Sequence, residues 1–257
     1  MTRIIAIANQ KGGVGKTTTS VNLSAGISLA GKRCLLVDLD PQGNATSGLG
    51  ITPPPTARGF HYLLEPDSAP TMVLPSMRQH LDLLPASPRL VDVEASLEHM
   101  SDKLKRLSRV FELISANYDV ILIDCPPSLG TLTLNALYAC QSVIVPIQCE
   151  YYAMEGLSKI TQAIKKIGRQ RGGGLIVEGI VMTMYDPRLQ LAQEVTQEVK
   201  EFFGKLVYRT IIPRDVALSE APSHGLSIME YSLRSKGARA YIELTREVLT
   251  NDSKEAR

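Results

Sequence analysis

A glycine-rich segment near the amino terminus contains the residue types that bind phosphate: Lys11-Gly12-Gly13-Val14-Gly15-Lys16-Thr17-Thr18. Glycines let the backbone wrap closely around an anion, and the N–H groups at the start of a helix then point at it. Lys16 is placed to reach the β- and γ-phosphates of a nucleotide, and the Thr17 hydroxyl is a ligand for Mg²⁺. The segment therefore predicts a nucleoside triphosphate site. The usual loop of this kind begins with a glycine, whereas this one has Lys11 ahead of Gly12.

Carboxylates stand at the ends of two apolar segments further along the chain. Asp38 and Asp40 end the run Leu36-Val37-Asp38-Leu39-Asp40, and Asp124 follows Ile121-Leu122-Ile123. An aspartate at the end of such a strand is suited to bind Mg²⁺ through water beside a phosphate loop. Asp38 and Asp40 occupy alternate positions, so we expect one to face the rim of the sheet and the other a neighbouring layer.

The base of the nucleotide is predicted from an absent motif. GTPases recognise guanine with a segment Asn-Lys-x-Asp, and none of the asparagines in this sequence is followed by Lys-x-Asp. The sequence therefore favours ATP, with Mg²⁺, over GTP.

Strands and helices alternate along the chain in the order that positions such a site. We expect strands at 3–8, 33–38, 118–124, 142–147 and 175–182, and helices at 16–30, 91–116, 131–140, 154–171, 189–203 and 238–249. The strands are continuously apolar, which indicates burial on both faces. This pattern predicts an α/β fold with a doubly wound, mostly parallel sheet covered by helices on both faces. Ligands bind such sheets at the carboxyl ends of the strands, where the residues above fall.

Composition sets broad limits on the class of protein. The chain has 257 residues, of which 44% are hydrophobic and 21% charged, which excludes a disordered or fibrous protein. We expect one domain over residues 1–257, with Pro53-Pro54-Pro55 in a loop. There is no uninterrupted apolar run of membrane-spanning length and no signal-peptide pattern. The four cysteines lack CxxC spacing, which favours a reduced, cytoplasmic protein.

Five longer segments together resemble the ParA/Soj chromosome-partitioning ATPases, which belong to the ParA/MinD class with a deviant Walker A loop. They are ANQKGGVGKTTT (8–19), LLVDLDPQGNATSGLG (35–50), ILIDCPPSLG (121–130), PIQCEYYAMEGL (146–157) and LSEAPSHG (218–225). The resemblance covers nearly the whole chain. It implies a P-loop NTPase fold and a slow ATPase that closes as a homodimer around ATP and is stimulated by a partner.

The resemblance also implies roles for individual residues. Lys11 would cross the dimer interface to the partner's nucleotide, and Asp40 would position the attacking water, so that Lys11, Lys16 and Asp40 are the catalytic candidates. Asp38 would lie near the outer shell of the metal, which Thr17 and Asp124 bind. Pro213 and Asp215, in Ile212-Pro213-Arg214-Asp215, match the region that contacts adenine.

The partners that the resemblance implies are double-stranded DNA, bound without sequence preference, and a ParB/Spo0J-like centromere-binding protein. Arg188 matches one DNA contact of the family, but Ala217 stands where another arginine is expected. Basic residues that could substitute by their position in the chain are Lys200, Arg234, Lys236 and Arg239. Residues 151–257 carry a net charge of +3, whereas residues 1–150 carry −1, so the basic excess lies in the half that holds these candidates. A nucleoid-associated protein is expected. The polar end at 250–257 argues against membrane targeting, and no helix-turn-helix precedes the loop.

Two other functions remain open at the level of sequence. The first is a related ATPase that positions a different cellular cargo, because both would use the same nucleotide switch. The second is an iron–sulfur electron donor, since relatives of the class hold a cluster with cysteines. Cys125 is followed by Pro126-Pro127 rather than by a glycine-rich turn, so we expect it to be a buried packing thiol.

Overall fold

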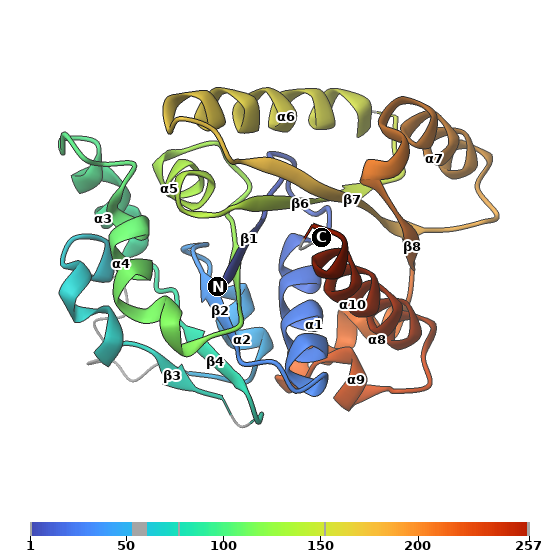
Figure 1. The fold of residues 1–257 in the computed structure, drawn as a ribbon. Coiled ribbons are helices and arrows are strands. Elements are labelled where there is room, and N and C mark those ends of the chain that lie inside the picture. The colour runs from blue at the N-terminus through green and yellow to red at the C-terminus, as the bar shows by residue number, and fades with distance from the viewer. Residues whose placement is uncertain (1, 53–60, 77, 152, 256–257) are drawn as a thin grey trace.

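An eight-stranded sheet forms the centre of the computed structural model, which describes residues 2–52, 61–76, 78–151 and 153–255 (Figure 1). The expected loop at Pro53-Pro54-Pro55 lies outside these ranges. The strand order is β3-β4-β2-β5-β1-β6-β7-β8, and every pairing is parallel except that of β3 with β4. The strands are β1 Arg3–Ile7, β2 Cys34–Asp38, β3 Leu74–Pro75, β4 Leu81–Leu84, β5 Val120–Asp124, β6 Ser142–Gln148, β7 Ile176–Tyr185 and β8 Val207–Pro213. The predicted fold class is confirmed.

Helices cover both faces of the sheet, which explains why its strands are apolar throughout (Figure 1). Along β1, Ile4 and Ala6 belong to one core cluster, while Ile5 and Ile7 belong to the other. The first cluster packs under α3 Leu90–Leu97, α4 Arg106–Ile114, α5 Thr131–Ala139, α6 Ala153–Gln170 and α7 Gln190–Phe203. The second packs under α1 Lys16–Leu29, α2 Asn44–Gly48, α8 Val216–Glu220, α9 Ile228–Tyr231 and α10 Lys236–Glu255.

The expected helix at 91–116 was wrong as one element, because the structure has two helices, α3 and α4, with a turn between them. Contacts from distant parts of the chain stabilise this turn. The Asn135 side chain donates to the carbonyl of Lys103 at 2.6 Å, and the Arg106 guanidinium donates to the carbonyl of Leu63 at 2.7 Å. The apolar residues keep a helical spacing across the turn between α3 and α4, so the sequence pattern does not show where one helix ends and the next begins.

Three strands were not expected from the sequence, and each lies toward an edge of the sheet. β3 and β4 are short, and β4 contains the half-buried Asp82. β8 carries Arg209 and Thr210 in its middle, where the register with β7 shifts. β3 and β8 are the two edge strands, and edge strands in proteins are commonly short or carry polar residues, which protects their unpaired backbone.

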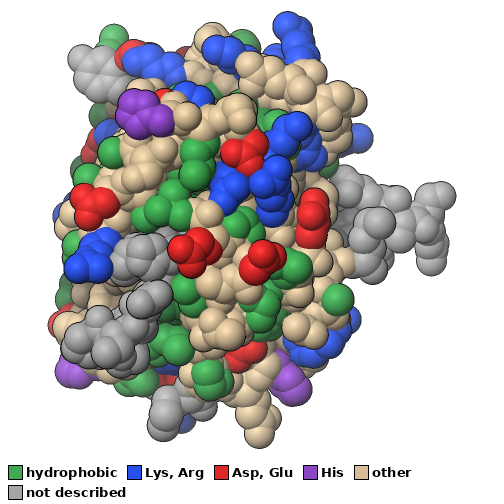
Figure 2. Space-filling view, turned by 90° about the vertical axis from the view of Figure 1, so that its left-hand side faces the viewer, with side chains coloured by type: hydrophobic (Ala, Val, Ile, Leu, Met, Phe, Trp, Pro, Cys, Tyr) green, Lys and Arg blue, Asp and Glu red, His purple; other side chains and the backbone are tan. Residues whose placement is uncertain are grey.

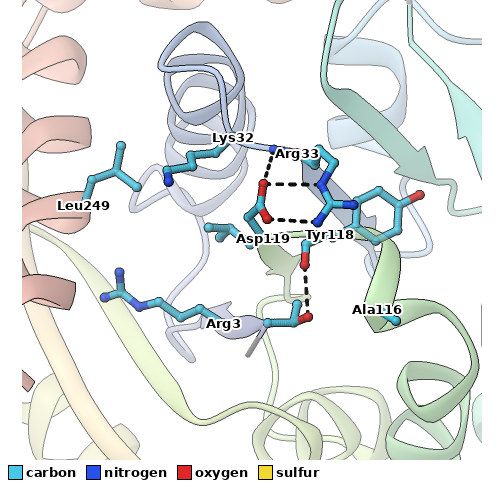
Figure 3. Close-up of a pocket in the computed structure, with 9 residues that line it drawn as sticks. Arg3, Lys32, Arg33, Ala116, Tyr118, Asp119 and Leu249 are labelled. Carbon is cyan, nitrogen blue, oxygen red and sulfur yellow. Dashed lines mark hydrogen bonds and ion pairs between the residues drawn. The ribbon is translucent and has the colours of Figure 1, made fainter. Parts of the chain in front are cut away.

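The amino ends of the strands form the rim opposite the phosphate loop. A pocket of about 480 Å³ opens there between the ends of α1 and α10, lined by Arg3, Lys32, Arg33 and Asp119 (Figure 3). Arg33 and Asp119 form an ion pair at 3.0 Å. No predicted site residue lines this pocket. Within the described ranges, none of the helices combines the length and the apolar character that a transmembrane span requires.

Candidate functional site

The phosphate loop joins the end of β1 to the start of α1 at the carboxyl rim of the sheet. α1 begins at Lys16, whose side chain is 6% exposed and whose Nζ donates to the carbonyl of Lys11 at 3.0 Å. Burial lowers the pKa of Lys16, although the nearby charges of Asp124 and Asp40 oppose this effect. A buried ammonium that spans the loop in this way is well placed to bind an anion held by the loop.

Asp124 lies directly beneath the loop, at the end of β5. Its Oδ2 accepts a hydrogen bond from the Thr17 hydroxyl at 2.8 Å, and its Oδ1 accepts one from the Ser20 hydroxyl at 2.8 Å. Burial raises the pKa of Asp124, and the neighbouring charge of Asp38 raises it further. The two residues expected to bind Mg²⁺, Thr17 and Asp124, are therefore hydrogen-bonded to each other.

Asp38 lies beside Asp124, because the two residues are partners in the parallel register of β2 and β5. One oxygen of Asp38 accepts hydrogen bonds from the Thr46 backbone N–H at 2.8 Å and the Thr46 hydroxyl at 2.7 Å. Burial raises the pKa of Asp38 despite these bonds. Two adjacent buried carboxylates repel each other, so a divalent cation with oxygen ligands fits this position. Thr17, Asp38 and Asp124 are the residues that would hold Mg²⁺.

Asp40 has different partners from Asp38, in line with their alternate positions. Its Oδ1 accepts from the Gln42 N–H at 3.0 Å, and its carbonyl accepts from the Gly43 N–H at 2.8 Å. The side chain is 8% exposed and close enough for its charge to act on both Lys16 and Asp124. Asp40 thus lies close to Lys16 of the phosphate loop and to Asp124.

Lys11 forms an ion pair with Glu150, which precedes α6, and its backbone N–H donates to the Asn9 side chain at 3.0 Å. The ammonium is therefore bound within its own chain. Gly12 and Gly13 are exposed at the tip of the loop, Val14 is buried, and Gly15 and Thr18 are half-buried.

Three residues around the loop were not predicted from the sequence. Ser20, on the same face of α1 as Lys16 and Thr17, was recognisable from its helical spacing. The Thr183 hydroxyl, near the carboxyl end of β7, lies 2.9 Å from the carbonyls of both Val14 and Ile147, either of which can accept its proton, and so connects the loop to the sheet. The sequence around Thr183 and Glu150 does not indicate that they contact the phosphate loop, because these contacts depend on the order of the strands in the sheet.

The predicted adenine contacts lie at the same rim. Pro213 is the last residue of β8, opposite Tyr185 of β7. Asp215 accepts from the Ala217 N–H at 3.1 Å and from the Gly237 N–H at 2.8 Å. Both of its carboxylate oxygens are therefore engaged with backbone, and the residue joins the starts of α8 and α10.

The predicted DNA-binding residues fall into two separate places. The Arg188 side chain is 85% exposed and pairs with Asp186 at 2.6 Å, and the charge of Arg214 also acts on Asp186. Arg234, Lys236 and Arg239 are exposed around the start of α10, which Asp215 fixes at the same rim. Lys200 lies apart from them, in a groove of about 1100 Å³ with Arg246, near the far end of α10.

On the described part of the face formed by α3 and α4, basic and acidic side chains are interspersed (Figure 2).

Cys125 is 1% exposed, and burial raises the pKa of its thiol well above the usual value. The four cysteines are all buried. This environment fits the expected packing role, because a buried protonated thiol is a poor metal ligand.

Comparisons with known proteins place this geometry in a family. Residues 2–175 match the model of an AAA domain family. The sporulation initiation inhibitor protein Soj of Bacillus subtilis is 49% identical over 98% of this chain and 100% of its own length. The chromosome partitioning protein ParA of Myxococcus xanthus is 46% identical over 98% of this chain and 89% of its own.

A solved structure agrees with these relatives. Cobyrinic acid a,c-diamide synthase from Mycobacterium smegmatis, crystallised with ADP and magnesium, has a TM-score of 0.85 and 35% identity, covering 100% of this chain and 97% of that chain. The chain is 46–49% identical to Soj and ParA over nearly its whole length, and its phosphate loop lies over paired carboxylates. It therefore belongs to the ParA/Soj family of chromosome-partitioning ATPases.

Proposed function

We propose that the chain is a DNA-segregation switch in which ATP closes a homodimer, the dimer binds DNA without sequence preference, and a ParB/Spo0J-like partner stimulates hydrolysis. The observation that carries the proposal is that Thr17 is hydrogen-bonded to the buried Asp124 beside the buried Lys16, in a loop with an additional lysine, Lys11. ATP and Mg²⁺ are the proposed ligands of this arrangement.

The position of each site residue suggests its role in binding or hydrolysing ATP. Lys16 binds the phosphates with its buried ammonium, and the backbone N–H groups of residues 12–17 bind their oxygens. Mg²⁺ at Thr17, Asp38 and Asp124 would neutralise charge on the phosphates. Asp40 orients a water toward the γ-phosphate, and release of Lys11 from Glu150 makes it available to a second copy. Pro213 and Asp215 border the adenine.

DNA binding is proposed for the basic residues near the carboxyl rim. Arg188 projects from the loop after β7, and Arg234, Lys236 and Arg239 surround the start of α10. Lys200 lies in a separate groove and is the weaker candidate. Because the dimer presents two copies of these residues, it neutralises more phosphates than one chain does.

ATP turnover with and without duplex DNA and the centromere-binding partner tests the proposal. Lys16→Gln should lower turnover by about 100-fold or more, because the developing phosphate charge loses its cation. It should also remove any effect of ATP on DNA binding. Lys32→Gln is the matched control, since Lys32 lies at the opposite rim, and it should behave as the wild type. Normal turnover in Lys16→Gln would exclude the site.

A further inference from the structure

Arg78 joins two parts of the chain that flank the site, although neither the motifs nor the proposed chemistry accounts for it. Its guanidinium donates through Nη1 to the carbonyl of Leu49 at 2.9 Å and through Nη2 to the carbonyl of Gly225 at 2.9 Å. Nε donates to the Glu230 carboxylate at 2.8 Å. The side chain is only 11% exposed. A planar guanidinium with three acceptors holds them in fixed relative positions.

The two backbones that Arg78 bridges are in direct contact. A Cβ added at Gly225 would lie 2.4 Å from the Cα of Gly50, and one added at Gly50 would lie 3.0 Å from the carbonyl oxygen of Gly225. Both glycines have positive φ angles, of 66° and 74°. A side chain at either position would separate the two segments. The contact between residues 49–51 and 225 is therefore a close backbone junction fastened by Arg78.

One side of this junction leads to the predicted metal site. Leu49 immediately follows α2, and its N–H donates to the Ala45 carbonyl at 3.2 Å. Within α2, Thr46 donates two hydrogen bonds to Asp38. A shift of Asp38 would therefore move α2 and, with it, the adjoining Leu49, whose carbonyl Arg78 binds.

The other side leads to the start of α10. Glu230 accepts from the Ser227 N–H at 2.8 Å and hydroxyl at 2.7 Å, which fixes α9. The N–H of Ile228 donates to Asn22 of α1 at 2.7 Å. α9 then leads directly into Arg234 and Lys236. The segment 221–231 therefore contacts α1 and directly precedes the basic residues at the start of α10 in the chain.

We infer that Arg78 is a positioning residue that clamps α2 to the segment 221–231, so that a nucleotide-dependent change at Asp38 is transmitted to the start of α10. This inference rests on the proposed function only in assigning DNA binding to that end of α10. Coupling between two sites requires an element that both of them bias, and the clamped pair is such an element.

Hydrogen–deuterium exchange with a slowly hydrolysed ATP analogue tests the clamp without DNA. In the wild type, the analogue should change exchange in both 44–51 and 221–231. In Arg78→Gln, the change should remain in 44–51 and disappear from 221–231. Arg78→Lys is the second variant, for use if Arg78→Gln folds poorly. It keeps the positive charge but loses the planar, forked guanidinium, so it should weaken the exchange response at 221–231. Arg33→Gln is the matched control, because it removes an arginine ion pair at the opposite rim.

Affinity for random-sequence duplex DNA provides the second readout. The ratio of affinities with ATP and with ADP should fall by about 5-fold or more in Arg78→Gln, the lower end of typical coupling. ATP binding should be unchanged. Persistence of the exchange response at 221–231 in Arg78→Gln, or its absence in the wild type, would overturn the clamp. An exchange response that depends on Arg78 in a protein that binds no DNA would support the clamp and contradict the proposed function.

Discussion

Asp38 and Asp40 are two residues apart and have different partners, so their substitutions should have different effects. Asp38 accepts hydrogen bonds from Thr46 of α2, whereas Asp40 closes the following turn and leaves its charge beside Lys16 and Asp124. The sequence predicted that Asp38 and Asp40 face different surroundings only from their alternate positions.

Asp40→Ala should retain ATP binding and lose turnover, because the group that we propose orients the water is removed while Lys16 and Thr17 remain. An ATP-bound dimer should then accumulate, which size-exclusion chromatography with light scattering would detect. Asp92→Ala, at an exposed position of α3, is the control and should turn over ATP normally. A monomeric Asp40→Ala that still hydrolyses ATP would show that Asp40 has no such role.

At the scale of elements, the close packing of β7 against β8 supports the loops at the carboxyl rim. A Cβ added at Gly179 of β7 would lie 2.3 Å from the ring of Tyr208 in β8. Tyr208 is nearly buried and donates to Glu178 at 3.1 Å, so its ring has little room to move. Strand β7, which carries Thr183, is therefore held by a contact that only glycine permits.

Gly179→Ala should lower the free energy of unfolding by about 1–3 kcal/mol, the usual cost of overpacking a core. Urea denaturation would measure this effect as a lower midpoint with an unchanged slope. Gly168→Ala in α6 is the comparison, because its Cβ would meet Leu175 at 3.6 Å, an ordinary contact. That variant should be as stable as the wild type or up to about 1 kcal/mol more stable, since alanine favours the helix. Equal stability of Gly179→Ala and the wild type would contradict the packing argument.

At the scale of the whole molecule, DNA binding should depend on nucleotide and on salt. The basic residues near the carboxyl rim are few, so one chain is expected to bind weakly, and the proposed ATP dimer would double the number of phosphates neutralised. Log affinity falls with log salt at about 0.9 per phosphate, so the slope with ATP should be about twice that with ADP. Titration of random-sequence duplex at several salt concentrations measures both slopes.

Arg188→Glu should weaken DNA binding at every sequence without changing ATP turnover in the absence of DNA, because its side chain is exposed and pairs only locally with Asp186. Because Ala217 stands where the resemblance leads us to expect a second arginine, we expect Arg188 to contribute a larger share of the proposed DNA binding. Equal DNA affinity of Arg188→Glu and the wild type with ATP would remove Arg188 from the interface.

The sequence by itself determined the sheet interior and the phosphate loop. Continuously apolar strands require burial on both faces, and the residues from Lys11 to Thr18 carry their chemistry in one uninterrupted segment. Asp124 was predictable for the same reason, because its position at the end of an apolar strand is a local property.

Only the tertiary structure decided which distant groups meet. It divided the expected helix at 91–116, paired Lys11 with Glu150, and engaged both oxygens of Asp215 with backbone. It also brought Arg78 to Leu49 and Gly225. These contacts join residues far apart in the chain, and their partners are set by strand order and helix packing. Local residue patterns record the chemistry of a segment but not the neighbours that the fold gives it.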